Sequence, residues 1–494
     1  MSQSIEQRRA EVQSAFATAM AWADASERRS FAAFESRLWT MLLGLGRALV
    51  GLFLAHQAQR PRAAEYRNGG RLYRLDDWRV SALGTRFGKV EFERPVGREP
   101  EDRRAAADLL VDRELGLCSG FSRGVVMGVT RLTAQMAFRV ARETYRDVYE
   151  WVPSPRAVLR MVDAVGERAR EFLEQAAAPE DDGEFLFIQV DGRGAPMISE
   201  AEHQRRRRPH EPRQAGSTNR KRRRLRRKER QRPRVRRTKG KKSKNAKVCV
   251  VGVLYTLQRT LEGIEGPIHK RIIATFESHR ALFLWLRREA DKRGYGNKRT
   301  VLLGDGSEHI WRLQQEFFPL AEACLDWYHV VEYLWSAGES VHKEGSAELR
   351  AWVACQSRRL RTGSTQAILD ELRRLRAGIS KTGPGTKGKR TRLDKTIKYL
   401  VDNRSRLIYE RLLGDDLDIG SGAVEGAVRN LVGMRLDGPG MRWSRQRSER
   451  VLHLRCILLN EQWEEFTRYL TGGRQLTLAA KPTPTIPHTA KRAA

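Results

Sequence analysis

Apolar positions in the first third of the chain recur mainly at helical spacing. The pattern over residues 1–66 predicts a mainly helical N-terminal region. The most apolar stretch of the chain lies within it, at 38–55. This stretch carries Arg47 near its middle, so a buried amphipathic helix is expected rather than a membrane span. Residues 67–100 contain short strand-like runs joined by a turn and predict a small β-hairpin segment. Residues 104–178 are again helical in pattern.

A turn interrupts the helical pattern near residue 150. It ends in Ser154 and Pro155, a good N-cap followed by a first-turn proline. A helix, a turn and a second helix carrying Arg156 and Arg160 fit a helix-turn-helix that reads DNA. Two helices joined by a turn are also common in helical domains, so an ordinary helical pair stays open as the alternative.

Continuous apolar runs typical of buried strands begin at residue 184. The order of elements is strand, strand, strand, helix, strand, helix, strand, which predicts an α/β sheet of mixed direction. The predicted strands cover 184–190, 248–257, 271–275, 300–306 and 323–325, with helices at 278–292 and 308–318.

Beyond this sheet the pattern becomes mainly helical. Residues 329–418 predict helices with a Gly/Lys-rich break at 379–390, and 419–470 predict further helices. The tail at 471–494 is rich in Pro, Thr and Ala and is expected to be disordered.

Composition adds a strong electrostatic constraint. The 494 residues include 93 Lys and Arg against 60 Asp and Glu, a net charge of +33, which indicates a polyanionic partner. A hydrophobic content of 40% excludes a wholly disordered protein. Five scattered cysteines form no CxxC pair, which argues against a disulfide framework or zinc ribbon and fits a reducing cytoplasm. The polar N-terminus has no apolar core of a signal peptide, and no membrane partner is expected.

Most of the positive charge is concentrated in one segment, 205–247. It holds 23 Lys and Arg against two acids, and it has too few apolar residues to form a core. We therefore expect a disordered basic arm that binds phosphates with a steep salt dependence. A solvated loop without a specific role is the alternative. The arginines expected to contact nucleic acid are Arg222, Arg223, Arg224, Arg226 and Arg227.

Three acidic residues carry the candidate chemistry. Asp191 and Asp305 each end a predicted strand and precede a glycine, and carboxylates at strand ends face the active-site crevice of open α/β sheets. Two such oxygens suit Mg²⁺ or Mn²⁺, and a third acid is needed to hold two ions. Glu425 is the best candidate, one turn after Ser421, which can cap a helix, and four residues before Arg429. The alternative is that both aspartates are turn residues and Glu425 is an ordinary surface acid.

Five motifs in a fixed order carry a family resemblance. They read IQVDGRG, VLLGDGSEHIW, CLDWYHVVEYL, DIGSGAVEGAVRNL and GMRWS. The chain resembles bacterial insertion-sequence transposases of the DDE class over residues 184–466, above all the ISKra-type family, whose layout is related to ISL-type and Mutator-like enzymes. The chain departs from some relatives in lacking paired N-terminal cysteines, which leaves the N-terminal mode of DNA binding open.

The resemblance implies a ribonuclease H-like catalytic domain with a helical insertion at 329–418. It puts Asp191, Asp305 and Glu425 at the positions of the metal-binding catalytic triad, with two Mg²⁺ or Mn²⁺ ions as cofactors. These ions would support hydrolysis at the element ends and then attack of the 3′-hydroxyl on target DNA.

The resemblance also implies residues that contact DNA. Asp326 and His329 match a short acid-x-x-His motif thought to position DNA near the cleavage site. His329 as a capping or core residue is the alternative. Trp443 lies where such enzymes carry an aromatic that stacks on an unpaired base, and a buried core tryptophan is the alternative. Arg429 is a further candidate DNA contact.

Together these features predict a DNA transposase in the bacterial cytoplasm, associated with the nucleoid. Its partners would be the terminal inverted repeats of the element and target DNA, and it would act as a homo-oligomer because two DNA ends must be joined together. Two other functions remain open: a non-catalytic nucleic-acid-binding protein, and another ribonuclease H-like nuclease without strand transfer.

Overall fold

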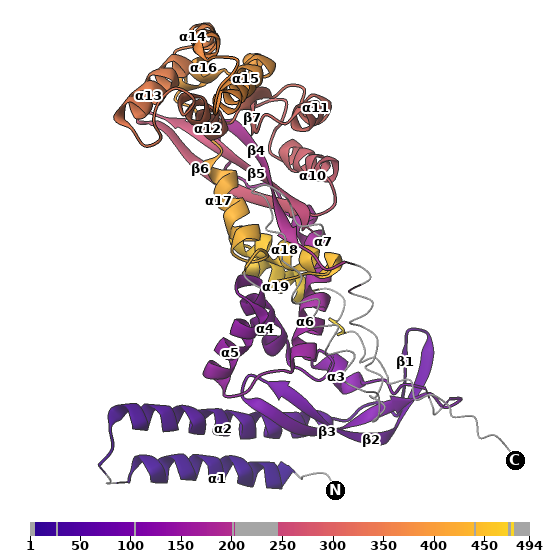
Figure 1. Cartoon of the computed structure of the whole chain (residues 1–494). Helices are drawn as coiled ribbons and strands as arrows, with labels where there is room; N and C mark the ends of the chain where they lie inside the picture. Colours follow the sequence, from indigo (N-terminus) through magenta and orange to yellow (C-terminus); the bar gives the residue numbers. More distant parts are fainter. Residues whose placement is uncertain are drawn as a thin grey trace, which may run out of the picture. The chain divides into compact units, whose positions relative to one another are not determined.

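The computed structural model describes two compact units. It covers residues 5–25, 28–102, 105–199, 202, 246–438, 441–472 and 476–478. One unit contains the chain up to Phe172 together with residues from Glu461 onward, and the second runs from Leu173 to Asn460 (Figure 1). Residues 205–245 of the predicted basic arm, with its five candidate arginines, and most of the predicted disordered tail lie outside the described residues, whereas Ala246 and Lys247 are described.

The first unit begins with two helices that pack side by side, α1 (Ile5–Ala23) and α2 (Phe31–Ala58) (Figure 1). Ser30 starts α2 by accepting a hydrogen bond from the Ala33 N–H. The antiparallel sheet of β1 (Glu65–Asn68), β2 (Arg71–Thr85) and β3 (Gly88–Arg98) confirms the predicted hairpin and adds a strand to it. These elements form the N-terminal core of the unit.

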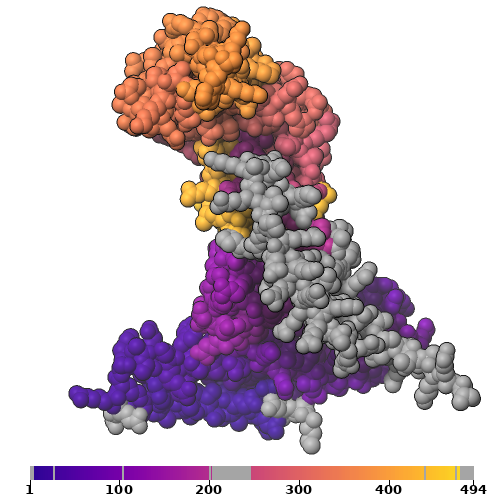
Figure 2. Space-filling view, in the orientation of Figure 1, coloured from indigo at the N-terminus to yellow at the C-terminus, as the bar shows by residue number. Residues whose placement is uncertain are grey.

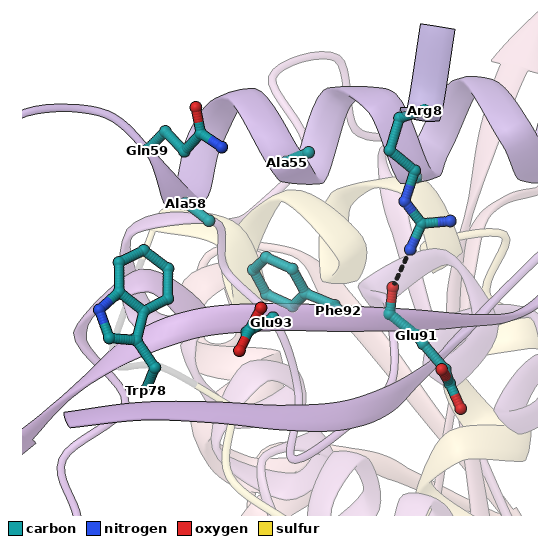
Figure 3. A pocket seen from close by; sticks show the side chains of 9 residues that line it. Arg8, Ala55, Ala58, Gln59, Trp78, Glu91, Phe92 and Glu93 are labelled. Carbon is teal, nitrogen blue, oxygen red and sulfur yellow. Dashed lines mark hydrogen bonds between the residues drawn. The ribbon is translucent and has the colours of Figure 1, made fainter. Parts of the chain in front are cut away.

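Helix α2 packs on this sheet with one face only. Leu54 and Ala58 join a buried cluster with Leu83, Val90 and Phe92 of the sheet. Arg8 of α1 donates to the Glu91 carbonyl oxygen at 2.9 Å (Figure 3). Only 17% of the most apolar 18-residue window of α2 is buried. The prediction of a buried helix was therefore wrong, because a three-stranded sheet and one polar helix leave part of its circumference uncovered.

The rest of the first unit is helical, as predicted. Its helices are α3 (Leu110–Glu114), α4 (Arg123–Gln135), α5 (Phe138–Tyr149), α6 (Pro155–Glu167), the start of α7 (Ala169–Gln175), and α19 (Trp463–Gly472) from the far end of the chain. Ser154 caps α6 by accepting from the Ala157 N–H at 3.3 Å, with Pro155 in the first turn, so the predicted helix start is confirmed. Phe172 packs against Phe466 of α19, with ring centroids 5.2 Å apart.

The second unit is built on a five-stranded mixed sheet with the order β6-β5-β4-β7-β8. The strands β4, β5 and β6 pair antiparallel, and β7 and β8 run parallel to β4. The bounds of the elements are β4 (Phe185–Pro196), β5 (Ala246–Thr260), β6 (Gly263–Thr275), α10 (His279–Lys292), β7 (Arg299–Gly304), α11 (Glu308–Phe317) and β8 (Glu322–Leu325). The predicted mixed α/β sheet and its order of elements are thus confirmed.

Two predicted strand bounds are wrong by several residues: β6 begins at Gly263 and not at residue 271, and β4 ends later than predicted. Strand β4 does not stop at Asp191 but continues to Pro196, because β5 keeps pairing with it as far as Ala246. Only the parallel ladder between β4 and β7 ends at this level, with Val190 opposite Gly304. Asp191 therefore still pairs with β5 on one edge of β4, but on the other edge it lies one residue beyond the last pair with β7.

The chain after β8 forms the predicted helical segment, orange in Figure 2. It contains α12 (Trp327–Gly338), α13 (Ala347–Arg361), α14 (Thr365–Gly378), α15 (Thr386–Asp402) and α16 (Tyr409–Gly414). Helix α15 begins inside the predicted break at 379–390. The unit closes with α17 (Gly422–Val428), a π-helical turn (Arg429–Gly433) and α18 (Arg445–Leu459), which packs on β6.

Candidate active site

The register of β4 and β7 brings two of the predicted acids together. Val190 pairs with Gly304 in the parallel ladder, so Asp191 and Asp305 are each the next residue beyond the last pair. Neighbouring strands lie about 4.8 Å apart, which makes these two residues neighbours although they are 114 positions apart in the sequence. The Gly192 N–H donates to Asp191 Oδ1 at 2.6 Å, and the Ser307 N–H donates to Asp305 Oδ1 at 2.9 Å. Both carboxylates are therefore held by the backbone just after the ladder.

A buried glutamine ties the third acid to the same strand. Gln189 is only 1% exposed, and its Oε1 accepts from the Val424 N–H of α17 at 3.0 Å. Its Nε2 donates to the Gly420 carbonyl oxygen at 3.1 Å and to the Tyr255 hydroxyl at 2.9 Å. Gln189 lies two positions before Asp191 and therefore points to the same face of the sheet. The start of α17, which carries Glu425, is thus fixed on the strand of the first aspartate.

Ser421 occupies the predicted N-cap position of α17 but makes no capping hydrogen bond with its side chain. Its Oγ instead donates to Glu425 Oε1 at 2.8 Å, and its N–H donates to Asp326 Oδ1 at 2.7 Å. The prediction that the Ser421 side chain caps α17 was therefore wrong, because its hydroxyl binds the carboxylate of Glu425 one turn later.

Asp326 connects α17 to the start of α12. It is 1% exposed, and its second oxygen accepts from the N–H of His329 at 3.0 Å and from the ring Nδ1 at 2.7 Å. A side chain buried in this way contacts no DNA in this conformation, so its place in the site is to orient His329 and Ser421. Burial alone would raise the pKa of Asp326, but hydrogen bonds from His329 and Ser421 hold that pKa below its ordinary value.

His329 is the cation of the site. Its hydrogen bond to Asp326 raises its pKa to about 9, against an opposing effect of burial, so the ring is protonated at neutral pH. The carboxylate of Asp305 acts in the same direction. Asp326 also accepts from the His329 backbone N–H, so this residue is both a helix-start residue and a charged group beside the acids.

The electrostatics of Asp191 join these groups into one cluster. Burial raises the pKa of Asp191, and the carboxylates of Asp305 and Glu425 add to that rise. The Gly192 N–H and the charge of His329 oppose it. Asp191 therefore interacts electrostatically with Asp305, Glu425 and His329, which are far from it in the sequence.

The donor atoms of this cluster suit a hard divalent cation. In the described part of the chain, Asp191, Asp305 and Glu425 each have a protein hydrogen bond on one oxygen only, which leaves the second oxygen for a ligand. Carboxylate oxygens are the ligands that Mg²⁺ and Mn²⁺ prefer. Among the residues that the structure describes, no three His, Cys, Asp or Glu side chains lie close enough together to ligate one ion. The acids therefore suit such an ion because they offer carboxylate oxygens and because a cation would relieve the repulsion that Asp191 experiences from Asp305 and Glu425. To ligate one ion together, their side chains would have to turn toward it.

The other predicted site residues lie elsewhere. Trp443 is 4% exposed, its Nε1 donates to the Leu436 carbonyl oxygen at 2.9 Å, and the Arg435 guanidinium lies over its ring, so the core alternative describes it. Arg429 is exposed where α17 passes into the π-helical turn. In the first unit, Arg156 of α6 is exposed and Arg160 is half-buried. These four residues do not join the acid cluster through any interaction that the structure describes.

Gln189 is the residue that sequence reasoning missed. Its signal is a single polar side chain within the apolar run Phe185–Val190. A buried amide in a central strand needs hydrogen-bond partners on another element, and that need identifies it.

Comparison with known proteins does not assign this chain to a family. Neither the known protein-family models nor the curated proteins contain a match to this sequence. Among solved structures, the chain is similar to the Drosophila P element transposase strand transfer complex, with 10% identity, 71% of this chain and 81% of that chain covered, and a TM-score of 0.22. A likeness at this TM-score does not establish a shared fold.

Proposed function

We propose that this chain is a metal-dependent DNA transposase of the DDE class, of the ISKra type, with a ribonuclease H-like catalytic core. The observation that carries the proposal is that Asp191 and Asp305 follow the last pair of the β4–β7 ladder, while Gln189 of β4 binds the start of α17, the helix of Glu425. The β4–β7 register supports it for Asp191 and Asp305. The hydrogen bonds of Gln189 to α17 support it for Glu425.

The three acids would hold two Mg²⁺ or Mn²⁺ ions. Such ions lower the pKa of bound water and stabilise charge at phosphorus, which serves both hydrolysis and attack by a 3′-hydroxyl. The residues of the chain orient this site: Gln189 fixes the start of α17, and Ser421 holds Glu425 through one oxygen. The protonated ring of His329 offers a positive group to the phosphate backbone beside the acids.

The charge of the chain supports DNA as the partner. The net charge of +33 favours a polyanion, and most of the basic segment 205–247 lies in the sequence between the end of β4 and the start of β5. We propose terminal inverted repeats and target DNA as substrates, a homo-oligomer as the active form, and the cytoplasm as the location.

The test is cleavage of DNA that carries the inverted repeats flanking the gene. The purified full chain should cut the repeat ends in Mg²⁺ but not in EDTA, and Asp305→Asn should abolish cutting while leaving DNA binding within about twofold. Asp370→Asn is the matched control, since Asp370 is an exposed carboxylate of α14 outside the acid cluster, and this variant should cut like the wild type.

Each other outcome has a meaning. Binding without any cleavage by the wild type would favour a non-catalytic nucleic-acid-binding protein. Cleavage without joining of the 3′-end to target DNA would favour another ribonuclease H-like nuclease. Cleavage by Asp305→Asn at the wild-type rate would refute the proposed site.

A further inference from the structure

Helix α2 leaves a row of large apolar side chains uncovered. Trp39, Leu42, Leu49 and Phe53 are 45–53% exposed, and their spacing of three, seven and four residues puts them on one stripe of the helix. Phe87 extends this surface: its ring lies where a Cβ on Gly46 would be, and it is itself 39% exposed. We call these five residues, together with Phe31 at the start of the helix, the α2 stripe.

The α2 stripe is large enough to form a specific protein interface. Its six side chains are 39–76% exposed. With roughly 200–250 Å² for a fully exposed large side chain, the stripe offers about 700 Å² of surface, against about 800 Å² for each partner in a standard interface. Isolated exposed apolar residues are normal, but a contiguous surface of this size marks an interaction site.

A membrane is a poor partner for this stripe. Helix α2 is long and apolar enough by composition to cross a bilayer. However, Arg47 lies at its midpoint and donates from Nε to the Phe87 carbonyl oxygen at 3.0 Å. The face of α2 that carries Leu43, Leu54 and Ala58, away from the α2 stripe, is buried in the first unit. Insertion would expose Arg47 to hydrocarbon and strip that face from the sheet.

We propose that the α2 stripe binds the same stripe of a second copy of this chain, with the two helices antiparallel about a two-fold axis between Leu45 and Gly46. A two-fold interface is self-complementary, so each residue meets the residue equally far from the axis on the other helix. This axis puts Leu42 of each copy against Leu49 of the other. Both leucines are 47–48% exposed and would be covered together.

The ends of the stripe are complementary about the same axis. Phe53 of the second copy would lie over Leu38, which lines a hollow of about 600 Å³ with Trp39 and Leu42. Glu35 lies between Phe31 and Trp39, and His56 follows Phe53; both are exposed, and the axis brings Glu35 of one copy beside His56 of the other. The hollow is also bordered by Asp147 and Glu150, so its rim is acidic where the His56 end arrives. The apolar residues, the hollow beside Leu38 and the charged ends of the helix are thus all complementary in the same antiparallel dimer.

The proposal goes beyond the assigned chemistry and does not depend on it, because every residue of the interface belongs to the first unit. Sedimentation velocity of the full chain without DNA should show a dimer. The double variant Leu49→Glu/Phe53→Glu should be monomeric, with at least a hundredfold weaker association and an unchanged circular dichroism spectrum. The matched control is Leu320→Glu, a leucine 70% exposed in the second unit, which should remain dimeric.

Charge reversal tests the orientation of the two helices. Glu35→Lys should weaken the dimer about tenfold, and Glu35→Lys/His56→Glu should restore it. A wild-type monomer at tens of micromolar, or a dimer unaffected by Leu49→Glu/Phe53→Glu, would overturn the proposal. Failure of the charge pair to restore association would overturn the antiparallel arrangement. Flotation of the wild type, but not of the double variant, with neutral phosphatidylcholine vesicles would assign the stripe to a membrane instead.

Discussion

Replacement of Gln189 by methionine tests the link between the first aspartate and the glutamate. The two side chains have similar length and volume, so the change removes hydrogen bonds without leaving a large cavity. The Val424 N–H, the Gly420 carbonyl and the Tyr255 hydroxyl each lose a partner in a buried region. At about 1–3 kcal/mol for each unsatisfied group, and with incomplete additivity, we expect Gln189→Met to lower the free energy of unfolding by about 2–4 kcal/mol.

The catalytic effect should exceed the effect on folding. Without Gln189, the start of α17 is no longer fixed on β4, and displacement of a reacting group by about 1 Å can reduce the rate about 10²-fold. We therefore expect a fall of about 10²-fold in the rate constant of Mg²⁺-dependent end cleavage, measured in single-turnover assays with saturating DNA. The dissociation constant for DNA should change less than twofold, because Gln189 is buried.

The matched control for this variant is Gln356→Met in α13. Gln356 is also 1% exposed, and its amide bonds to Glu371 and Arg359, outside the acid cluster. Urea unfolding should show a similar loss of stability for the two variants, with normal cleavage only for Gln356→Met. Wild-type cleavage rates for Gln189→Met would refute the positioning role of the glutamine.

Three further perturbations have defined outcomes. The folded-state pKa of His329, about 9, lies above its ordinary value of 6.5, so its stabilising effect is complete below pH 6.5 and disappears as the pH rises through 9. Because its side chain is 37% exposed, we expect His329 to contribute only about 1 kcal/mol to the free energy of unfolding. The difference in this free energy between wild type and His329→Gln, measured by urea unfolding, should shrink from pH 6 to pH 10, and a constant difference would contradict the expectation. Arg94→Met leaves Asp112 buried without its ion-pair partner and should cost the first unit about 3–5 kcal/mol in thermal unfolding, most of it regained in Arg94→Met/Asp112→Leu; an unchanged Tm would show that the pair is not needed. Deletion of residues 205–244, outside the described structure, should weaken DNA binding and flatten its salt dependence in fluorescence anisotropy, whereas unchanged binding would exclude the segment as a DNA contact.

Local patterns predicted most elements of the second unit correctly. Continuous apolar runs identified every strand from β4 to β8, because both faces of a central sheet must be apolar. The length of β4 was misjudged, since Asp191-Gly192 ends a parallel ladder but not the antiparallel one beside it. Pairing with a second neighbour is a tertiary property that a turn-like dipeptide does not reveal.

The uncovered face of α2 shows the same limit in the first unit. Apolar composition predicted the helix and its tendency to be buried. How much of the helix is covered depends on which elements pack on it: the sheet and α1 make most of its contacts, and the end of α5 contacts Trp39 and Thr40. The remaining apolar face became apparent only in three dimensions.

The sequence alone determined the basic charge, the mixed α/β class and the acidic residues worth considering, because each is a property of composition or of local periodicity. Tertiary structure decided which of those residues meet. The β4–β7 register made Asp191 and Asp305 neighbours, and the buried amide of Gln189 tied α17 to the same strand. It also buried Asp326 and Trp443, two residues expected to contact DNA. The physical reason is that strand register, burial and buried hydrogen bonds depend on contacts between segments far apart in the chain, which no local pattern encodes.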